Sequence, residues 1–111
     1  MKRRKVTEAR PVEQLPGITR RTLAFSDRLM LCQFTAKKGS KFLLHNHKAA
    51  QIGYVVSGHL RFIGATEADA FEAVAGQSYV FEPDEQHGAD VLEDAVILEI
   101  FTPSREEFKD L

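Results

Sequence analysis

Residues 39–51 read Gly-Ser-Lys-Phe-Leu-Leu-His-Asn-His-Lys-Ala-Ala-Gln. Successive side chains of a β-strand point to opposite faces, so residues two positions apart lie on the same side. His45 and His47 have this spacing and can bind one metal ion together. A third histidine, His87, lies in a second segment, residues 76–88, which is punctuated by glycine and proline. Three of the four histidines therefore fall in two short segments, and this concentration is the main indication of function.

The composition is that of a single soluble globular domain. The chain has 111 residues, of which 43% are hydrophobic and 28% are charged, and both fractions are ordinary for such proteins. Its one cysteine, Cys32, excludes an internal disulfide framework and favours a reducing compartment. The neighbours of Cys32 are mostly apolar, so we expect a buried and unreactive thiol.

Charge is concentrated at the N-terminus, where residues 1–21 hold seven Lys or Arg and two Glu. A basic arm can contact nucleic acid, but no aromatic residues are interleaved here and no nucleic-acid module follows. We therefore expect a solvated tail, or an arm lying on an acidic partner subunit, and no nucleic-acid partner. No apolar segment follows the basic start, and none reaches the ~20 residues of a membrane span. We expect no membrane association and a cytoplasmic location.

Short apolar or alternating runs separated by turn signals predict an all-β sandwich or barrel. The runs are Thr22–Phe25, Leu29–Ala36, Lys41–His45, Gln51–Val56, His59–Gly64, Ala70–Val74, Ser78–Phe81 and Val91–Phe101.

The dipeptide Ser57-Gly58 predicts a tight hairpin between two of these runs. Helix signals are weak, except for a short C-terminal turn that opens at Pro103 with Ser104 as its cap. We expect an N-terminal basic arm over residues 1–17 and one β-barrel domain over residues 18–111.

The spacing Gly-x5-His-x-His-x3-Gln-x6-Gly, from Gly39 to Gly58, resembles the first motif of the cupin superfamily. The segment from Gly76 to Gly88 resembles the second, with Asp84 where a turn glycine is usual. Aspartate tolerates the left-handed conformation better than most residues. The resemblance implies a single-domain jelly roll, a double-stranded β-helix barrel. It also implies one bound divalent metal, with ligands from His45, His47, Gln51 and His87.

Gln51 stands where cupins usually supply a glutamate ligand. Three imidazoles and an amide leave the +2 charge of the ion uncompensated, so we expect a stronger Lewis acid that favours an anionic ligand but is held less tightly. Four protein ligands leave two positions open on an octahedral ion, which suits catalysis. Zn, Ni, Fe, Mn and Co all remain candidates, because this ligand set suits each of them.

A narrower resemblance covers residues 18–108. The stretches 51–58, 92–94 and 101–108 are similar to small single-domain cupins called pectin-degradation proteins, which promote ring opening of unsaturated uronates. This resemblance implies that Glu99, Phe101 and Arg105 belong to the active site, with Glu99 in place of the aspartate typical of that family.

The residues themselves leave the roles of Glu99 and Arg105 open. Glu99 interrupts the apolar run 96–101, and a carboxylate there needs a partner, a metal or a raised pKa if it is buried. The alternative is a solvent-exposed edge. Arg105 is either an exposed surface charge or a residue whose planar guanidinium group binds a substrate carboxylate. We expect Phe101 to form a pocket wall.

The leading functional hypothesis is a metal-dependent enzyme that opens or tautomerises a small unsaturated sugar acid, with Glu99 as proton carrier and Arg105 as anion binder. A metal-dependent dioxygenase is a second hypothesis, because such sites also suit iron and oxygen. A cupin that binds or senses a sugar acid without turnover is a third. We expect a homodimer formed by pairing of sheet edges and exchange of N-terminal strands.

Overall fold

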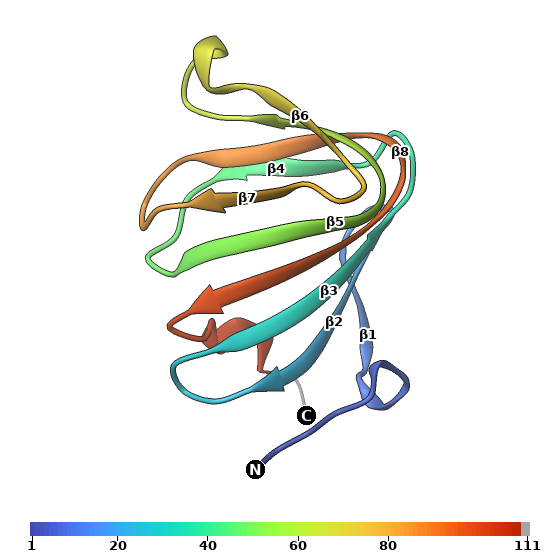
Figure 1. The fold of residues 1–111 in the computed structure, drawn as a ribbon, viewed down its shortest axis with the longest axis vertical. Coiled ribbons are helices and arrows are strands. Elements are labelled where there is room, and N and C mark those ends of the chain that lie inside the picture. Colours follow the sequence, from blue (N-terminus) through green and yellow to red (C-terminus); the bar gives the residue numbers. More distant parts are fainter. Residues whose placement is uncertain (110–111) are drawn as a thin grey trace.

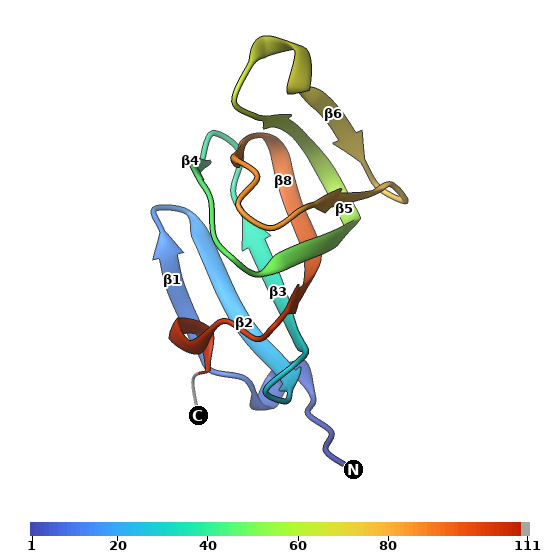
Figure 2. The same ribbon diagram turned by 90° about the vertical axis from the view of Figure 1, so that its left-hand side faces the viewer.

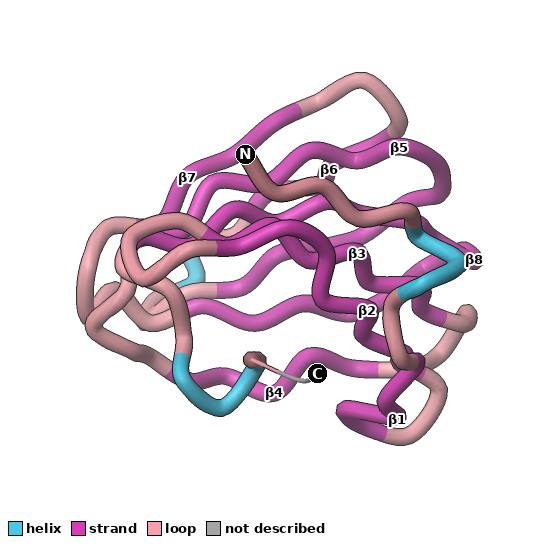
Figure 3. The backbone as a smooth tube through the Cα atoms, turned by 90° about the horizontal axis from the view of Figure 1, so that it is seen from below, coloured by secondary structure: helices cyan, strands magenta, loops and turns pink. Residues whose placement is uncertain are grey.

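The computed structural model describes residues 1–109, and most of that backbone lies in antiparallel strands (Figure 1, Figure 3). The strands are β1 (Pro11–Leu15), β2 (Ile18–Phe25), β3 (Met30–Ala36), β4 (Lys41–His45), β5 (Ala50–Ile63), β6 (Phe71–Val74), β7 (Ser78–Phe81) and β8 (His87–Thr102). Three short 3-10 helices complete the fold: η1 (Val6–Glu8), η2 (Glu67–Asp69) and η3 (Glu106–Phe108). The all-β prediction is confirmed. None of the helices in the described part of the chain has the length and apolar character that a membrane crossing requires.

The two long strands β5 and β8 form the centre of the molecule. They pair from Ala50 opposite Thr102 to Ile63 opposite Gly88. The strand order is β1-β2-β3-β8-β5-β6, with β4 on β8 and β7 on β5. One half of β5 and β8 therefore extends a sheet containing β1, β2, β3 and β7, while the other half extends a sheet containing β4 and β6. The two sheets curl around a shared interior (Figure 2).

The predicted hairpin at Ser57-Gly58 is wrong, because β5 continues through this dipeptide as one strand of 14 residues. The register between β5 and β8 shifts around Ser57 and again around His59. Gly58 has φ +96°, a conformation that only glycine adopts at low cost. The glycine thus produces a bulge that bends the strand from one sheet into the other, instead of a chain reversal.

The core lies between the sheets because alternate residues of each strand point inward. All seven residues of β3 follow this alternation, from buried Met30 to buried Ala36. Val55, Leu60 and Ile97 contribute from the central strands and are at most 2% exposed. The same interior contains buried polar side chains, namely Arg20, Thr22, Gln51, His87 and Glu99. Such groups are costly to bury without partners, and three of them, Gln51, His87 and Glu99, line one cavity and mark a candidate site.

Both ends of the described chain pack onto the first sheet. Within residues 1–17, β1 pairs with β2, and Nη1 of Arg4 donates to the carbonyl oxygen of Thr22 at 2.7 Å. The domain boundary at residue 17 stays a prediction. The expected C-terminal turn is present as η3, but Ser104 is not its cap: η3 begins after Arg105, and the Ser104 hydroxyl instead donates to the carbonyl of Ser26.

Candidate metal centre and pocket

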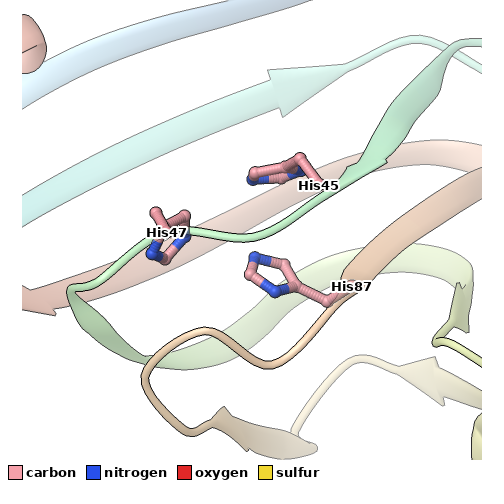
Figure 4. Close-up of side chains that lie close together, drawn as sticks. All are labelled: His45, His47 and His87. Atoms are coloured by element: carbon pink, nitrogen blue, oxygen red, sulfur yellow. The ribbon is translucent and has the colours of Figure 1, made fainter.

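Three histidines meet at one end of the interior. His45 ends β4, His47 lies two residues further on, and His87 begins β8. The pairing of β4 with β8 places His45 directly opposite His87. One nitrogen atom from each of the three rings lies within 4.8 Å of the other two, and Figure 4 shows the rings turned toward one another. The grouping expected from the two sequence segments is therefore present.

The second segment also fixes the first one in place. The backbone N–H of Asp84 donates to the carbonyl oxygen of His47 at 2.8 Å, and the side-chain amide of Asn46 donates to the carbonyl of Asp84 at 3.3 Å. Asp84 has φ +64°, so the left-handed conformation expected for this turn position is observed. The turn before β8 thus holds the loop that carries His47.

Backbone contacts determine which nitrogen of each ring is available. Nδ1 of each histidine lies 2.7 or 2.8 Å from a carbonyl oxygen, those of Leu43, Ala49 and Glu85. A carbonyl only accepts, so the proton sits on Nδ1 and the neutral ring keeps a lone pair on Nε2. Burial lowers the pKa of His47, and it lowers that of His87 to about 4. Near neutral pH both rings are uncharged, as metal binding requires.

The buried atoms fit a cation. Within residues 1–109, Nε2 of His87 is buried and has no hydrogen-bond partner. Oε1 of Gln51 lies 3.0 Å from Nε2 of His47, which sets two lone pairs against each other when the ring is neutral. A divalent ion satisfies all of these atoms at once, and three imidazoles with one amide oxygen are an ordinary transition-metal ligand set. The three histidines are therefore a candidate site for a divalent metal.

Glu99 lies immediately behind Gln51. The amide nitrogen of Gln51 donates to Oε2 of Glu99 at 2.9 Å, and the hydroxyl of Tyr79 donates to Oε1 at 2.6 Å. Glu99 is 3% exposed, so the solvent-exposed edge considered from the sequence does not occur. Burial raises the pKa of Glu99 to about 7, against the opposing effect of the two hydrogen bonds. Burial and the neighbouring carboxylate raise the pKa of Tyr79, which stays a donor.

A cavity of about 230 Å³ joins these groups to the C-terminal segment. His45, Gln51, His87 and Glu99 line it together with Phe101 and Arg105. The Arg105 side chain is 17% exposed and lies over two rings, 4.2 Å from the centre of Phe108 and 5.2 Å from that of Phe101. Its Nε donates to Glu107 at 2.8 Å. The surface-charge alternative for Arg105 thus does not describe its position, because the side chain lies at the cavity wall.

Several lining residues were not foreseen from the sequence. The wall also includes aromatic side chains from four distant strands and from η3, namely Phe34, Phe42, Phe62, Phe81 and Phe108. Tyr79, which reaches Glu99, was also missed. Nothing local in the sequence marks these residues. Those on strands read as ordinary inward positions, and only the tertiary structure brings them and Phe108 to the site.

The remaining histidine and the cysteine lie apart from the metal centre. His59 lies on β5, where its Nε2 contacts Oε1 of Glu72 at 2.7 Å. Cys32 is fully buried, and burial raises the pKa of its thiol to about 11. The expectation of a buried, unreactive thiol agrees with both observations.

A family model for the cupin domain matches residues 33–101 of the sequence. The chain belongs to the cupin family. Among solved structures, this cupin is similar to KdgF from Halomonas sp., with 28% identity, a TM-score of 0.87, and coverage of 96% of this chain and 97% of that one. An RmlC-like cupin from Shewanella frigidimarina is also similar, with 26% identity, a TM-score of 0.85, and coverage of 92% and 90%. These likenesses confirm the jelly-roll prediction and the resemblance to pectin-degradation cupins.

More distant likenesses show the fold alone. The polyketide cyclase RemF from Streptomyces resistomycificus is 22% identical, with a TM-score of 0.79 and coverage of 96% of this cupin and 82% of that chain. An oxalate decarboxylase from Bacillus subtilis is 21% identical, with a TM-score of 0.83, and this cupin spans 31% of its length. No curated protein matches the sequence.

Proposed function

We propose that this cupin is a metal-dependent enzyme that promotes ring opening or tautomerisation of a small unsaturated sugar acid, a uronate. The observation that carries the proposal is the shared cavity, which is lined by three of the four candidate metal ligands (His45, Gln51 and His87), by the buried Glu99 carboxylate and by Arg105. Its volume of about 230 Å³ suits a ligand smaller than a drug-sized molecule. The likeness to KdgF supports the choice of substrate class.

The chain's own residues supply binding and proton transfer. Arg105 presents a guanidinium at the wall, stacked over two aromatic rings that limit its movement, and this group binds the substrate carboxylate. Phe101 forms the wall beside it. Glu99 carries the proton that moves, since it is buried and borders the same cavity. His45, His47, Gln51 and His87 would hold a divalent metal, which would supply Lewis-acid chemistry at a substrate oxygen.

Replacing Glu99 tests the proposed reaction. At saturating metal, Glu99→Gln should still bind one metal per chain but lower turnover of the unsaturated product of pectate or alginate lyase by about 100-fold or more, because general acid–base catalysis contributes that much. Glu93→Gln is the matched control, since Glu93 is an exposed carboxylate on the same strand and should leave turnover unchanged. Metal analysis and a ring-opening assay measure the two quantities. Full activity of Glu99→Gln would show that Glu99 is not the proton carrier.

The same preparation separates the other two hypotheses. Oxygen uptake with diketones, thiols or flavonoids, without activity on the uronate, would identify a dioxygenase instead. Tight, saturable uronate binding with the ligand recovered unchanged would identify a binding protein. Either result would overturn the proposed isomerase activity.

We also propose that this cupin acts as a cytoplasmic homodimer. The outer face formed by β3, β7, and the paired halves of β5 and β8 carries no charged side chain. It consists of Leu31, Gln33, Thr35, Ile52, Tyr54, Val56, Ser78, Val80, Val96, Leu98 and Ile100. Five of its apolar members are 41–57% exposed, namely Ile52, Tyr54, Val56, Val80 and Ile100. We call it the uncharged face.

The other sheet gives an internal comparison, because its outer face carries Lys41, Arg61, Glu72 and Asp90. An uncharged face can meet its own copy across a two-fold axis without repulsion between like charges. The uncharged face thus supports a dimer in which the two copies pack face to face. This arrangement differs from edge pairing and strand exchange.

A further inference from the structure

Three residues on adjacent strands form a row beside the metal centre. Gly53 of β5 lies opposite Tyr79 of β7 on one side and opposite Glu99 of β8 on the other. A side chain at position 53 would stand between the other two. A Cβ placed on Gly53 would overlap the ring and the hydroxyl of Tyr79. The absence of a side chain is therefore what lets Tyr79 reach across a whole strand to Glu99.

The contact made in this way occupies one half of the carboxylate. The Tyr79 hydroxyl donates to Oε1 of Glu99 at 2.6 Å, and the Gln51 amide donates to Oε2 at 2.9 Å. Tyr79 is 7% exposed and its ring packs against Phe62, with ring centres 4.3 Å apart. Because both the ring and the hydroxyl are held, Tyr79 fixes the plane and position of the Glu99 carboxylate.

The orientation of Gln51 depends on that carboxylate. An amide has one donor end and one acceptor end. With its nitrogen bound to Glu99, Gln51 turns its oxygen toward Nε2 of His47, 3.0 Å away. The reverse orientation would set the amide oxygen against the carboxylate and present N–H groups to the histidines, where they cannot bind a cation.

We propose that Tyr79 is a positioning residue, made possible by Gly53, that acts through Glu99 to hold the Gln51 oxygen toward the three histidines. This inference rests on the metal site of the proposed function. It assigns Glu99 a second task besides proton transfer, and it places a carboxylate one side chain behind the neutral ligand. A glutamine can then serve as a neutral ligand, because the nearby Glu99 carboxylate offsets part of the +2 charge of the ion.

Titration with cobalt(II) alone tests the proposal without any substrate. Partners that orient metal ligands typically contribute 10- to 100-fold in affinity, so Glu99→Ala should weaken cobalt binding by about that factor. Tyr79→Phe should weaken it by about 3- to 10-fold, because one of two supports of the carboxylate is lost. The visible absorption of bound cobalt should change in both variants. Tyr54→Phe is the matched control: this other tyrosine lies on the outer face of β5 and is 46% exposed.

Action through Glu99 makes a further prediction. Adding Tyr79→Phe to Glu99→Ala should cause no further loss of affinity. In the metal-free protein, the side-chain amide signals of Gln51 in a ¹H–¹⁵N NMR spectrum should shift in Tyr79→Phe and stay unchanged in Tyr54→Phe. This second measurement reads the amide directly.

The outcomes are distinguishable from failure of the proposed function. If the wild-type protein binds no cobalt, both the metal site and this inference are wrong. If it binds cobalt and Tyr79→Phe leaves affinity, absorption and the Gln51 signals unchanged, only this inference is wrong. A loss in the double variant beyond that of Glu99→Ala would also overturn it, because Tyr79 would then act independently of Glu99.

Discussion

In the proposed metal site, Gln51 and Glu99 would share the task of the glutamate expected from the cupin motif that the sequence resembles. Gln51 would give an oxygen lone pair without charge. Glu99, whose Oε2 accepts from the Gln51 amide nitrogen at 2.9 Å, would give the charge. The sequence argument treated the ion as uncompensated, because residues 51 and 99 are far apart along the chain. In the proposed site, this contact would reduce the expected excess charge at a bound metal while a neutral ligand stays in direct contact with it.

Cys32 provides a prediction at the scale of one residue. Burial raises its pKa from 9.0 to about 11, and two pKa units mean about 100-fold less thiolate at pH 8. Alkylation by iodoacetamide at pH 8 should therefore be at least about 100-fold slower in the native protein than in the same protein in urea. Mass spectrometry of timed samples measures both rates. Rapid native labelling, with circular dichroism unchanged, would contradict the buried position.

Site residues that are close together in the sequence could be predicted from their spacing, whereas those brought together by strand pairing could not. The i, i+2 relation of His45 and His47 is visible in the sequence because a strand imposes it. Tyr79 lies 20 residues from Glu99 in the sequence, and their contact requires the register of three strands together with the missing side chain at Gly53. No local pattern encodes that combination.

At the scale of elements, β5 shows why the strand prediction was incomplete. Ser57-Gly58 has the composition of a hairpin turn, and local composition does not distinguish a turn from a bulge. The decision comes from β8, which pairs with β5 on both sides of the bend. The same pairing extends β8 through Glu93 and Asp94, two residue types that are depleted in strands. Both long strands thus result from tertiary pairing overriding local preference.

The bulge in β5 gives a prediction about stability. Gly58 and Gly76 have similar φ values, +96° and +91°. A Cβ at Gly58 would overlap the backbone of Asp94 and Ala95, whereas a Cβ at Gly76 meets nothing within 4 Å. Gly76→Ala should therefore lower the free energy of unfolding by only about 1–2 kcal/mol, the cost of the left-handed conformation. Gly58→Ala should cost on the order of 3 kcal/mol or more.

Urea denaturation of the two variants measures this difference. Gly76→Ala is the matched control, because it carries the same conformational strain without the overlap. Equal losses of unfolding free energy in the two variants would contradict the prediction. The close approach of β5 and β8 would then add no cost, and the left-handed conformation alone would explain the need for glycine at position 58.

At the scale of the whole molecule, the fold class was predictable because many short strands at regular spacing leave few all-β architectures, and the two motifs selected one of them. How copies of the molecule associate was less predictable. Edge pairing and exchange of N-terminal strands were expected from an exposed sheet edge and the basic arm, and they stay a prediction; within the described chain, β1 pairs with β2. The uncharged face was not visible in the sequence, because its members are single outward residues scattered over four strands.

The uncharged face makes the final prediction. The wild-type protein should have a molecular mass in solution of twice 12.5 kDa by light scattering after gel filtration. Ile52 lies between Val80 and Ile100 within the face. In a dimer formed through this face, Ile52→Lys would bury one lysine from each copy without a partner charge. The variant should therefore have the mass of the monomer. Val74→Lys is the matched control, since Val74 is 45% exposed on β6 of the other sheet. A dimer that survives Ile52→Lys would favour edge pairing and strand exchange, and a monomeric wild type would exclude both routes.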